Sequence, residues 1–118
     1  MSMKKIDIKG KEYVMVNERI KEFRDKYKHG AILTEILSNM EGVAMFKATV
    51  VNDGNVLATG HAYEKEGSSF INKTSYIENA ETSAIGRALG ILGIGIDTSI
   101  ASFEEVENAK VQHKDLEL

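Results

Sequence analysis

The chain has 118 residues, of which 42% are hydrophobic, and this size fits one domain with a core of its own. It contains no cysteine, which excludes a disulfide framework, a thiolate nucleophile and a thiolate metal site. The formal net charge is -3, which taken alone argues against a nucleic-acid partner.

The acidic excess is concentrated at the C-terminal end of the sequence. Residues 104–118 hold five acidic residues and two lysines, so the other 103 residues carry 13 acidic and 13 basic side chains and are neutral. We therefore predict one domain over residues 1–103, followed by an acidic C-terminal helix and tail over residues 104–118. A neutral domain of this kind can hold a basic groove on one of its faces.

No segment of the sequence is typical of a targeting or membrane element. The N-terminal lysines are not followed by the run of about 7–15 apolar residues that a secretory signal needs. No stretch approaches the roughly 20 apolar residues that span a bilayer. We therefore expect a cytoplasmic protein without a membrane partner.

The first predicted elements are a strand and a helix. Residues 12–16 are rich in β-branched and aromatic types and predict a short strand. Asn17 is a suitable N-cap for an amphipathic helix over residues 18–28, and Gly30 is a suitable C-terminal signal. The apolar side of this helix is formed by residues three or four positions apart: Ile20, Phe23 and Tyr27.

Three antiparallel strands are predicted next, at residues 31–38, 43–52 and 55–65. Asp53-Gly54 between two apolar runs is a strong signal for a two-residue hairpin turn. The pairs that this turn predicts are Val51 with Val56, Phe46 with His61, and Ala44 with Tyr63. In this register Tyr63 shares a face with Phe46, whereas Lys47 lies on the other. Neither face is cleanly polar, so we expect protein to cover one face and a helix or a ligand to cover the other.

A long helix is predicted after a Gly/Ser-containing loop at residues 66–74. Ser75 and Glu78 have the spacing of a capping box, the helix covers residues 76–92, and Gly93 ends it. Small residues along one side let this helix lie close to its support: Ala80, Ala84 and Ala88.

A second capping box, Ser102 with Glu105, predicts a short C-terminal helix over residues 103–111. Strands and helices are therefore separated along the chain, which is typical of an α+β fold. We predict a small curved antiparallel sheet with the long helix packed on it and the short helix at the C-terminal end.

No catalytic or metal-binding arrangement is recognisable in the sequence. His29, His61 and His113 share no metal-ligand spacing with one another or with a carboxylate. The glycine-rich run at residues 90–95 follows a helix, whereas a phosphate cradle needs its glycines before a helix start. We therefore expect no enzymatic activity, no cofactor and no metal.

Aromatic and basic residues supply candidates for a nucleic-acid site. Proteins that bind single strands combine a basic groove with rings on which bases stack. The candidates on the predicted hairpin and the following loop are Tyr63, Phe70, Lys47, Lys65 and Lys73. Arg24 and Lys28 form a second basic patch at the end of the first helix, and Arg87 on the long helix is a further phosphate ligand. The alternatives are core packing for the rings and a solvated or ion-paired surface for the cations.

Two segments of the chain carry a resemblance to a known family. They are residues 11–27 (KEYVMVNERIKEFRDKY) and residues 76–95 (YIENAETSAIGRALGILGIG). The chain resembles, over nearly its whole length, small single-stranded DNA-binding proteins of phages that infect lactococci and streptococci. The resemblance implies a variant of the OB-fold, a homodimer, and a role in phage DNA replication or recombination alongside phage or host proteins.

Three functions remain open as hypotheses. The first is sequence-nonspecific binding of single-stranded DNA in the cytoplasm of an infected bacterium. The second is annealing of complementary single strands, because runs related to ETSAIGRAL also occur in phage recombination proteins. The third is a protein-binding module that targets a host factor, which the net negative charge favours.

Overall fold

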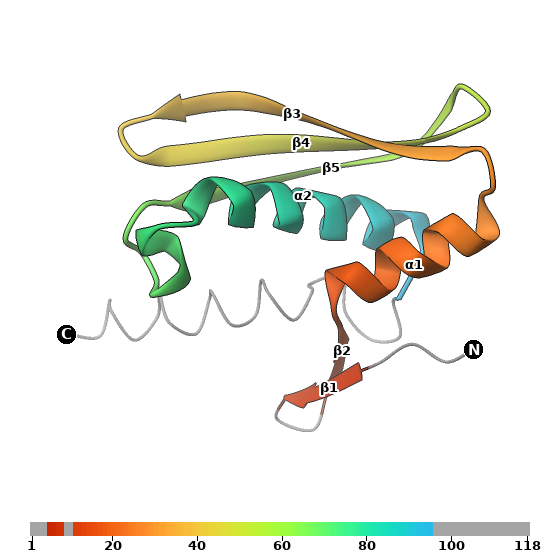
Figure 1. Cartoon of the computed structure of the whole chain (residues 1–118), viewed down its shortest axis with the longest axis horizontal. Helices are drawn as coiled ribbons and strands as arrows, with labels where there is room; N and C mark the ends of the chain where they lie inside the picture. Colours follow the sequence, from red (N-terminus) through yellow and green to blue (C-terminus); the bar gives the residue numbers. More distant parts are fainter. Residues whose placement is uncertain (1–4, 9–10, 96–118) are drawn as a thin grey trace.

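Two helices lie on one side of a three-stranded antiparallel sheet (Figure 1). The computed structural model describes residues 5–8 and 11–95. In chain order its elements are β1 (Lys5–Ile8), β2 (Lys11–Val14), α1 (Val16–Lys26), β3 (Gly30–Met40), β4 (Val43–Asn52), β5 (Asn55–Lys65), the 3-10 turn η1 (Ile71–Lys73) and α2 (Tyr76–Leu92). The α+β class predicted from the sequence is therefore confirmed. The predicted C-terminal helix at 103–111 and the acidic tail at 104–118 lie outside the described residues.

A separate small hairpin precedes the first helix. In it β1 pairs with β2 in antiparallel fashion, with Ile6 opposite Tyr13. The sequence predicts only the second of these strands, at residues 12–16. The structure therefore adds β1 and ends β2 at Val14, before the start of α1.

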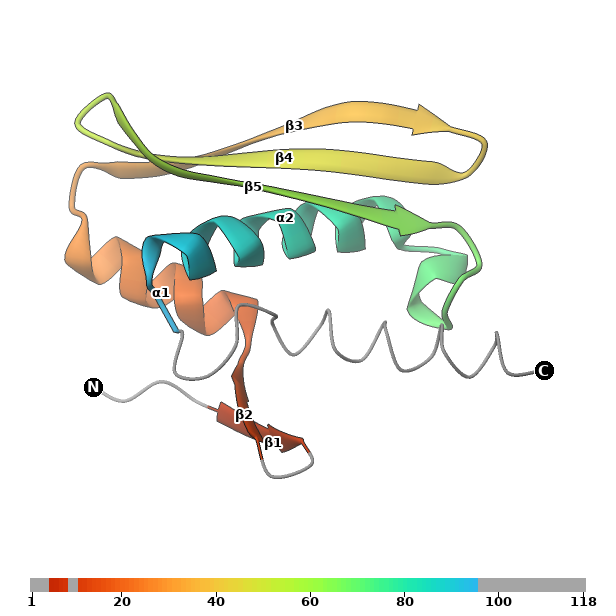
Figure 2. The same ribbon diagram turned by 180° about the vertical axis from the view of Figure 1, so that it is seen from behind.

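The main sheet has the strand order β3-β4-β5, with both neighbouring pairs antiparallel. An OB-fold is a five-stranded Greek-key barrel. The described strands do not confirm that architecture, because β3 and β5 are the edges of an open three-stranded sheet. Viewed from behind, both helices again lie on the same side of this sheet, with α2 against it and α1 in contact with α2 (Figure 2). No element within the described residues covers its other face.

Helix α2 packs very close to β5 because small residues meet at their contact. A Cβ atom placed on Gly60 would lie 2.5 Å from the backbone nitrogen of Ala88 and 2.8 Å from the carbonyl oxygen of Ala84. Ala80, Ala84 and Ala88 are fully buried in the core. The prediction that a small-residue side lets this helix approach its support is therefore confirmed.

The helix ends agree with the sequence in part. Gly93 ends α2 in the left-handed conformation, with a φ of 106°, as predicted. Ser75 occupies the N-cap of α2, but its side chain makes no capping hydrogen bond, so the predicted capping box is not formed. Helix α1 covers Val16–Lys26, with Met15 at its N-cap and Tyr27 at its C-cap. The predicted range of 18–28, with Asn17 as the N-cap and Gly30 as the C-terminal signal, is therefore wrong by two residues at each end. This earlier start places the Val16 side chain in the buried interior.

A β-bulge interrupts the pairing of β4 and β5. Val51 pairs with Val56, as the turn predicts, but Val50 pairs with Ala58. Leu57 is therefore an extra residue on β5, and its side chain packs against the core cluster.

The bulge changes every pair that lies beyond it. Phe46 pairs with Ala62 and not with His61, and the predicted pair of Ala44 with Tyr63 is wrong by the same single residue. Because successive side chains of a strand alternate between the two faces, this shift moves Tyr63 to the face opposite Phe46. Phe46 is buried under the helices, so Tyr63 points to the uncovered face.

Candidate functional site

The face of the main sheet that points away from both helices carries many apolar side chains. We name it the open face, and the members that matter here come from all three strands: Leu33, Glu35, Met40, Met45, Lys47, Val56, His61, Tyr63 and Lys65. Five of these are large hydrophobic or aromatic residues that remain exposed. Met40, Met45 and Tyr63 lie together at one end of the open face, and Leu33 and Val56 lie towards the other end. Exposed apolar surface on an uncovered sheet face is typical of an interaction site.

Tyr63 forms the centre of an aromatic and cationic group on the open face. Its side chain is 65% exposed, and it lies opposite Met45 on β4. Lys47 lies opposite His61, and Lys65 follows Tyr63 at the two-residue spacing that keeps both on one face. Neighbouring residues on one face of a sheet have Cβ atoms about 5–8 Å apart. The tyrosine ring therefore has two lysines as neighbours.

One acidic side chain belongs to this surface. Glu35 lies opposite Lys47 in the pairing of β3 with β4. The described structure records no ion pair between these two side chains. The strand residues of the open face therefore carry two lysines, one histidine and one carboxylate, and the surface is slightly positive.

Phe70 and Lys73 lie on a different surface. The Phe70 side chain is 82% exposed, and Lys73 Nζ lies 5.9 Å from the centroid of its ring, within the range of a cation–π contact. Figure 1 places η1, which contains Lys73, beside the start of α2 on the helix side of the sheet. These two residues therefore do not extend the open face.

Buried hydrogen bonds hold this loop in place. The Asn72 side chain is fully buried, and its Nδ2 donates to Glu64 Oε2 at 2.8 Å and to Ser68 Oγ at 2.9 Å. Asn79 Nδ2 donates to Asn72 Oδ1 at 3.0 Å. The network joins the end of β5, the loop and the first turn of α2, so Phe70 is presented from a fixed support.

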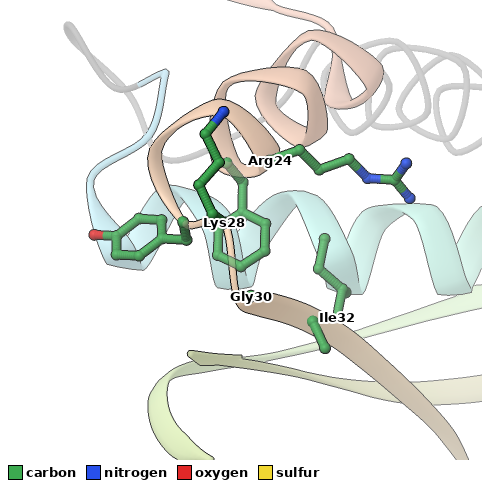
Figure 3. Close-up of a pocket in the computed structure, with 7 residues that line it drawn as sticks. Arg24, Lys28, Gly30 and Ile32 are labelled. Carbon is green, nitrogen blue, oxygen red and sulfur yellow. The ribbon is translucent and has the colours of Figure 1, made fainter. Parts of the chain in front are cut away.

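The three remaining candidates lie on α1, in the turn that follows it, and on α2. Arg24 and Lys28 line a pocket at the end of α1 (Figure 3). Arg87 is exposed on α2, which packs against the covered face of the sheet. The structure therefore brings Tyr63, Lys47 and Lys65 together on the open face. It places the other five predicted site residues elsewhere: Phe70, Lys73, Arg24, Lys28 and Arg87.

Two kinds of residue were not found from the sequence. Met45 and His61 belong to the open face, and the bulge at Leu57 places Met45 opposite Tyr63 and His61 opposite Lys47. Arg19 is only 1% exposed, and its Nη1 donates to the carbonyl oxygen of Gly86 at 2.8 Å. Its position on the apolar side of α1, four residues before Phe23, is the signal that identifies it as an inward-facing residue.

Metal and membrane features are absent from the part of the chain that the structure describes. Within residues 5–8 and 11–95, no group of three or more histidine or carboxylate side chains is arranged to hold a metal ion. No helix in the same ranges has the length and the apolar character needed to cross a bilayer.

Comparison with known proteins gives one family. A family model described as Slr1353 N-terminal dsRNA-binding domain-like matches residues 20–92, which include most of α1, the whole main sheet and all of α2. No curated protein matches the chain. No solved structure matches it.

Proposed function

The chain belongs to the family described as Slr1353 N-terminal dsRNA-binding domain-like, and we propose that it binds nucleic acid as a single strand, DNA in particular, on the open face. The observation that carries this proposal is the exposed Tyr63 ring with Lys47 and Lys65 as neighbours on an uncovered sheet. Aromatic rings on open antiparallel sheets are established platforms for unpaired bases.

The chemistry of the open face suits a single strand because bases and phosphates find different partners there. A base that stacks on an aromatic side chain gains about 1–3 kcal/mol. Met45, opposite Tyr63, and Leu33, further along the open face, offer apolar surface for further base or sugar contacts. Lys47 and Lys65 can neutralise about two phosphates. A plot of the logarithm of the binding constant against the logarithm of the salt concentration is therefore expected to have a slope of about -1.4.

Binding to double-stranded RNA is the second candidate, and the description of the family favours it. A double-stranded RNA-binding domain contacts about 16 base pairs, mostly through the backbone. The helix starts of this chain are poorly suited to phosphates, because Glu18 lies in the first turn of α1 and Glu78 in the first turn of α2. The exposed tyrosine is also of little use to a duplex whose bases are stacked. We therefore place the single strand first.

The resemblance to phage proteins supplies the finer parts of the proposal. On that basis we propose DNA as the natural strand, a homodimer as the binding unit and a role in replication or recombination in the cytoplasm of an infected bacterium. The expected OB-fold likeness is not needed for it, since the proposed contacts depend on the face of the sheet and not on closure of a barrel. Annealing of complementary strands is an alternative function that would use the same single-strand binding. Binding of a host protein is the alternative that involves no nucleic acid.

A titration with three labelled ligands tests the proposal. Fluorescence anisotropy of oligothymidine, a DNA duplex and an RNA duplex is measured at one salt concentration. We expect the tightest binding for oligothymidine. Tighter binding of the RNA duplex would select the second candidate, and absence of binding to all three would select the protein-binding module. Mixing complementary strands with the protein, together with light scattering, separates an annealing ring from a dimer.

A further inference from the structure

A pocket lies between the end of α1 and the start of β3, away from the open face. Its volume is 280 Å³, which is near the lower limit for small-molecule sites. Figure 3 shows Arg24 and Lys28 on the α1 side of this pocket and Gly30 and Ile32 on the β3 side. Phe23, Tyr27 and Ala31 complete its lining.

Two of the residues that line the pocket, Phe23 and Tyr27, are closely packed aromatic residues. The ring of Phe23 is almost fully buried, and its centroid lies 5.2 Å from that of Tyr27 in a stacked arrangement. Gly30 has no side chain because none fits, since a Cβ atom there would lie 2.5 Å from Phe23 Cζ. The Phe23 ring therefore fills the space beside Gly30. The apolar surface that a ligand can reach in this pocket comes from the half-buried Tyr27 and Ile32.

Two positively charged side chains that line the pocket, Arg24 and Lys28, are not neutralised by carboxylates of α1. Lys21 and Lys26 of α1 lie 3.6 Å and 3.9 Å from carboxylates of the same helix. Arg24 and Lys28, in contrast, form no ion pair with any carboxylate of the described residues. No acidic side chain lines the pocket. The two cations that line the pocket are therefore those available to an anionic ligand.

We propose that this pocket binds a nucleoside monophosphate group, with the flat base against Tyr27 and Ile32 and the phosphate held by Arg24 and Lys28. A small apolar surface alone would suit many ligands, and two exposed cations alone would suit any anion. Their combination in a pocket of this size fits a ligand that has a flat ring and a phosphate a few bonds apart. Such a group belongs to a free mononucleotide or to the phosphorylated 5′ end of a strand.

The primary test is calorimetric titration of the full chain with thymidine 5′-monophosphate, thymidine and inorganic phosphate. We expect the monophosphate to bind more tightly than either fragment. We expect R24Q and K28Q each to weaken it about tenfold or more, because a charge-assisted hydrogen bond is lost. The matched controls are K21Q and K26Q, which remove the same charge from the same helix outside the pocket, and they are expected to leave the affinity within about twofold.

Two further measurements locate the ligand and assign its source. Amide NMR spectra recorded with the monophosphate are expected to shift at residues 23–32 and not along β5. Oligothymidines with and without a 5′ phosphate show whether a strand end competes for the pocket. The Y63L variant separates this site from the open face, because it is expected to weaken oligothymidine binding while the monophosphate still binds. The proposal is overturned by equal affinity for thymidine and its monophosphate, by shifts located elsewhere, or by equal losses in the control variants.

Discussion

Gly60 on β5 lies directly against the backbone of Ala88 on α2, with no room for even one additional carbon atom between them. This contact sets the distance between α2 and the sheet, and thereby the depth of the core beneath the open face. A Cβ atom on Gly60 would lie 2.5 Å from the Ala88 nitrogen, and the neighbour is backbone that cannot rotate away. Glycine is needed at position 60 because a side chain would collide with α2, and not because the backbone has a positive φ there.

The first prediction is that G60A destabilises the fold. The added methyl group forces α2 away from β5, and overpacking of this kind costs about 1–3 kcal/mol. Urea denaturation followed by circular dichroism measures the change in the free energy of unfolding. H61A, on the exposed side of the same strand, serves as the control and is expected to change stability by less than about 0.5 kcal/mol. Equal stability of G60A and the parent chain would contradict the close approach.

The second prediction concerns the loop that carries Phe70. N72A removes two donated hydrogen bonds, to Glu64 and Ser68, and the acceptor of Asn79. Loss of buried polar partners costs about 1–3 kcal/mol for each group left without one, so a fall of at least that size is expected in the free energy of unfolding. K73A, one residue further along and exposed, is expected to stay within about 0.5 kcal/mol of the parent chain.

The main elements of the fold could be predicted from the sequence because local signals specify them. Asp53-Gly54 specifies the turn between β4 and β5. The periodic alanines indicate α2, and Gly93 marks its C-terminal end. The same local rules place the three strands of the main sheet. These signals act over a few residues and do not depend on distant packing.

The composition of the open face could not be predicted, because it depends on the bulge at Leu57. The Leu57 side chain packs against core residues that are distant in sequence, so local signals do not reveal the bulge. Without it, Tyr63 would share a face with the buried Phe46. The sequence therefore identifies Tyr63, Lys47 and Lys65 as candidates, but it does not show that they are neighbours, nor that Phe70 and Lys73 lie apart from them.

The third prediction uses salt dependence to count phosphate contacts on the open face. K47Q and K65Q each remove one cation, and each is expected to reduce the magnitude of the salt slope for oligothymidine by about 0.7. K26Q removes the same charge from α1, where Lys26 lies 3.9 Å from Glu22, and is expected to leave the slope unchanged. Anisotropy titrations at four salt concentrations give the slopes. Equal reductions in all three variants would indicate a general effect of net charge and not a localised strand.

The fourth prediction separates the two exposed rings as stacking platforms. Y63L keeps an apolar side chain on β5 but removes the ring, so oligothymidine affinity is expected to fall by about 1–3 kcal/mol, or roughly 5- to 150-fold. F70L makes the corresponding change on the loop at the helix side of the sheet. Because Phe70 lies away from the open face, this variant is expected to bind within about twofold of the parent chain. A loss in F70L with none in Y63L would move the strand from the open face to the loop, whereas losses in both would require a strand that passes around the end of β5.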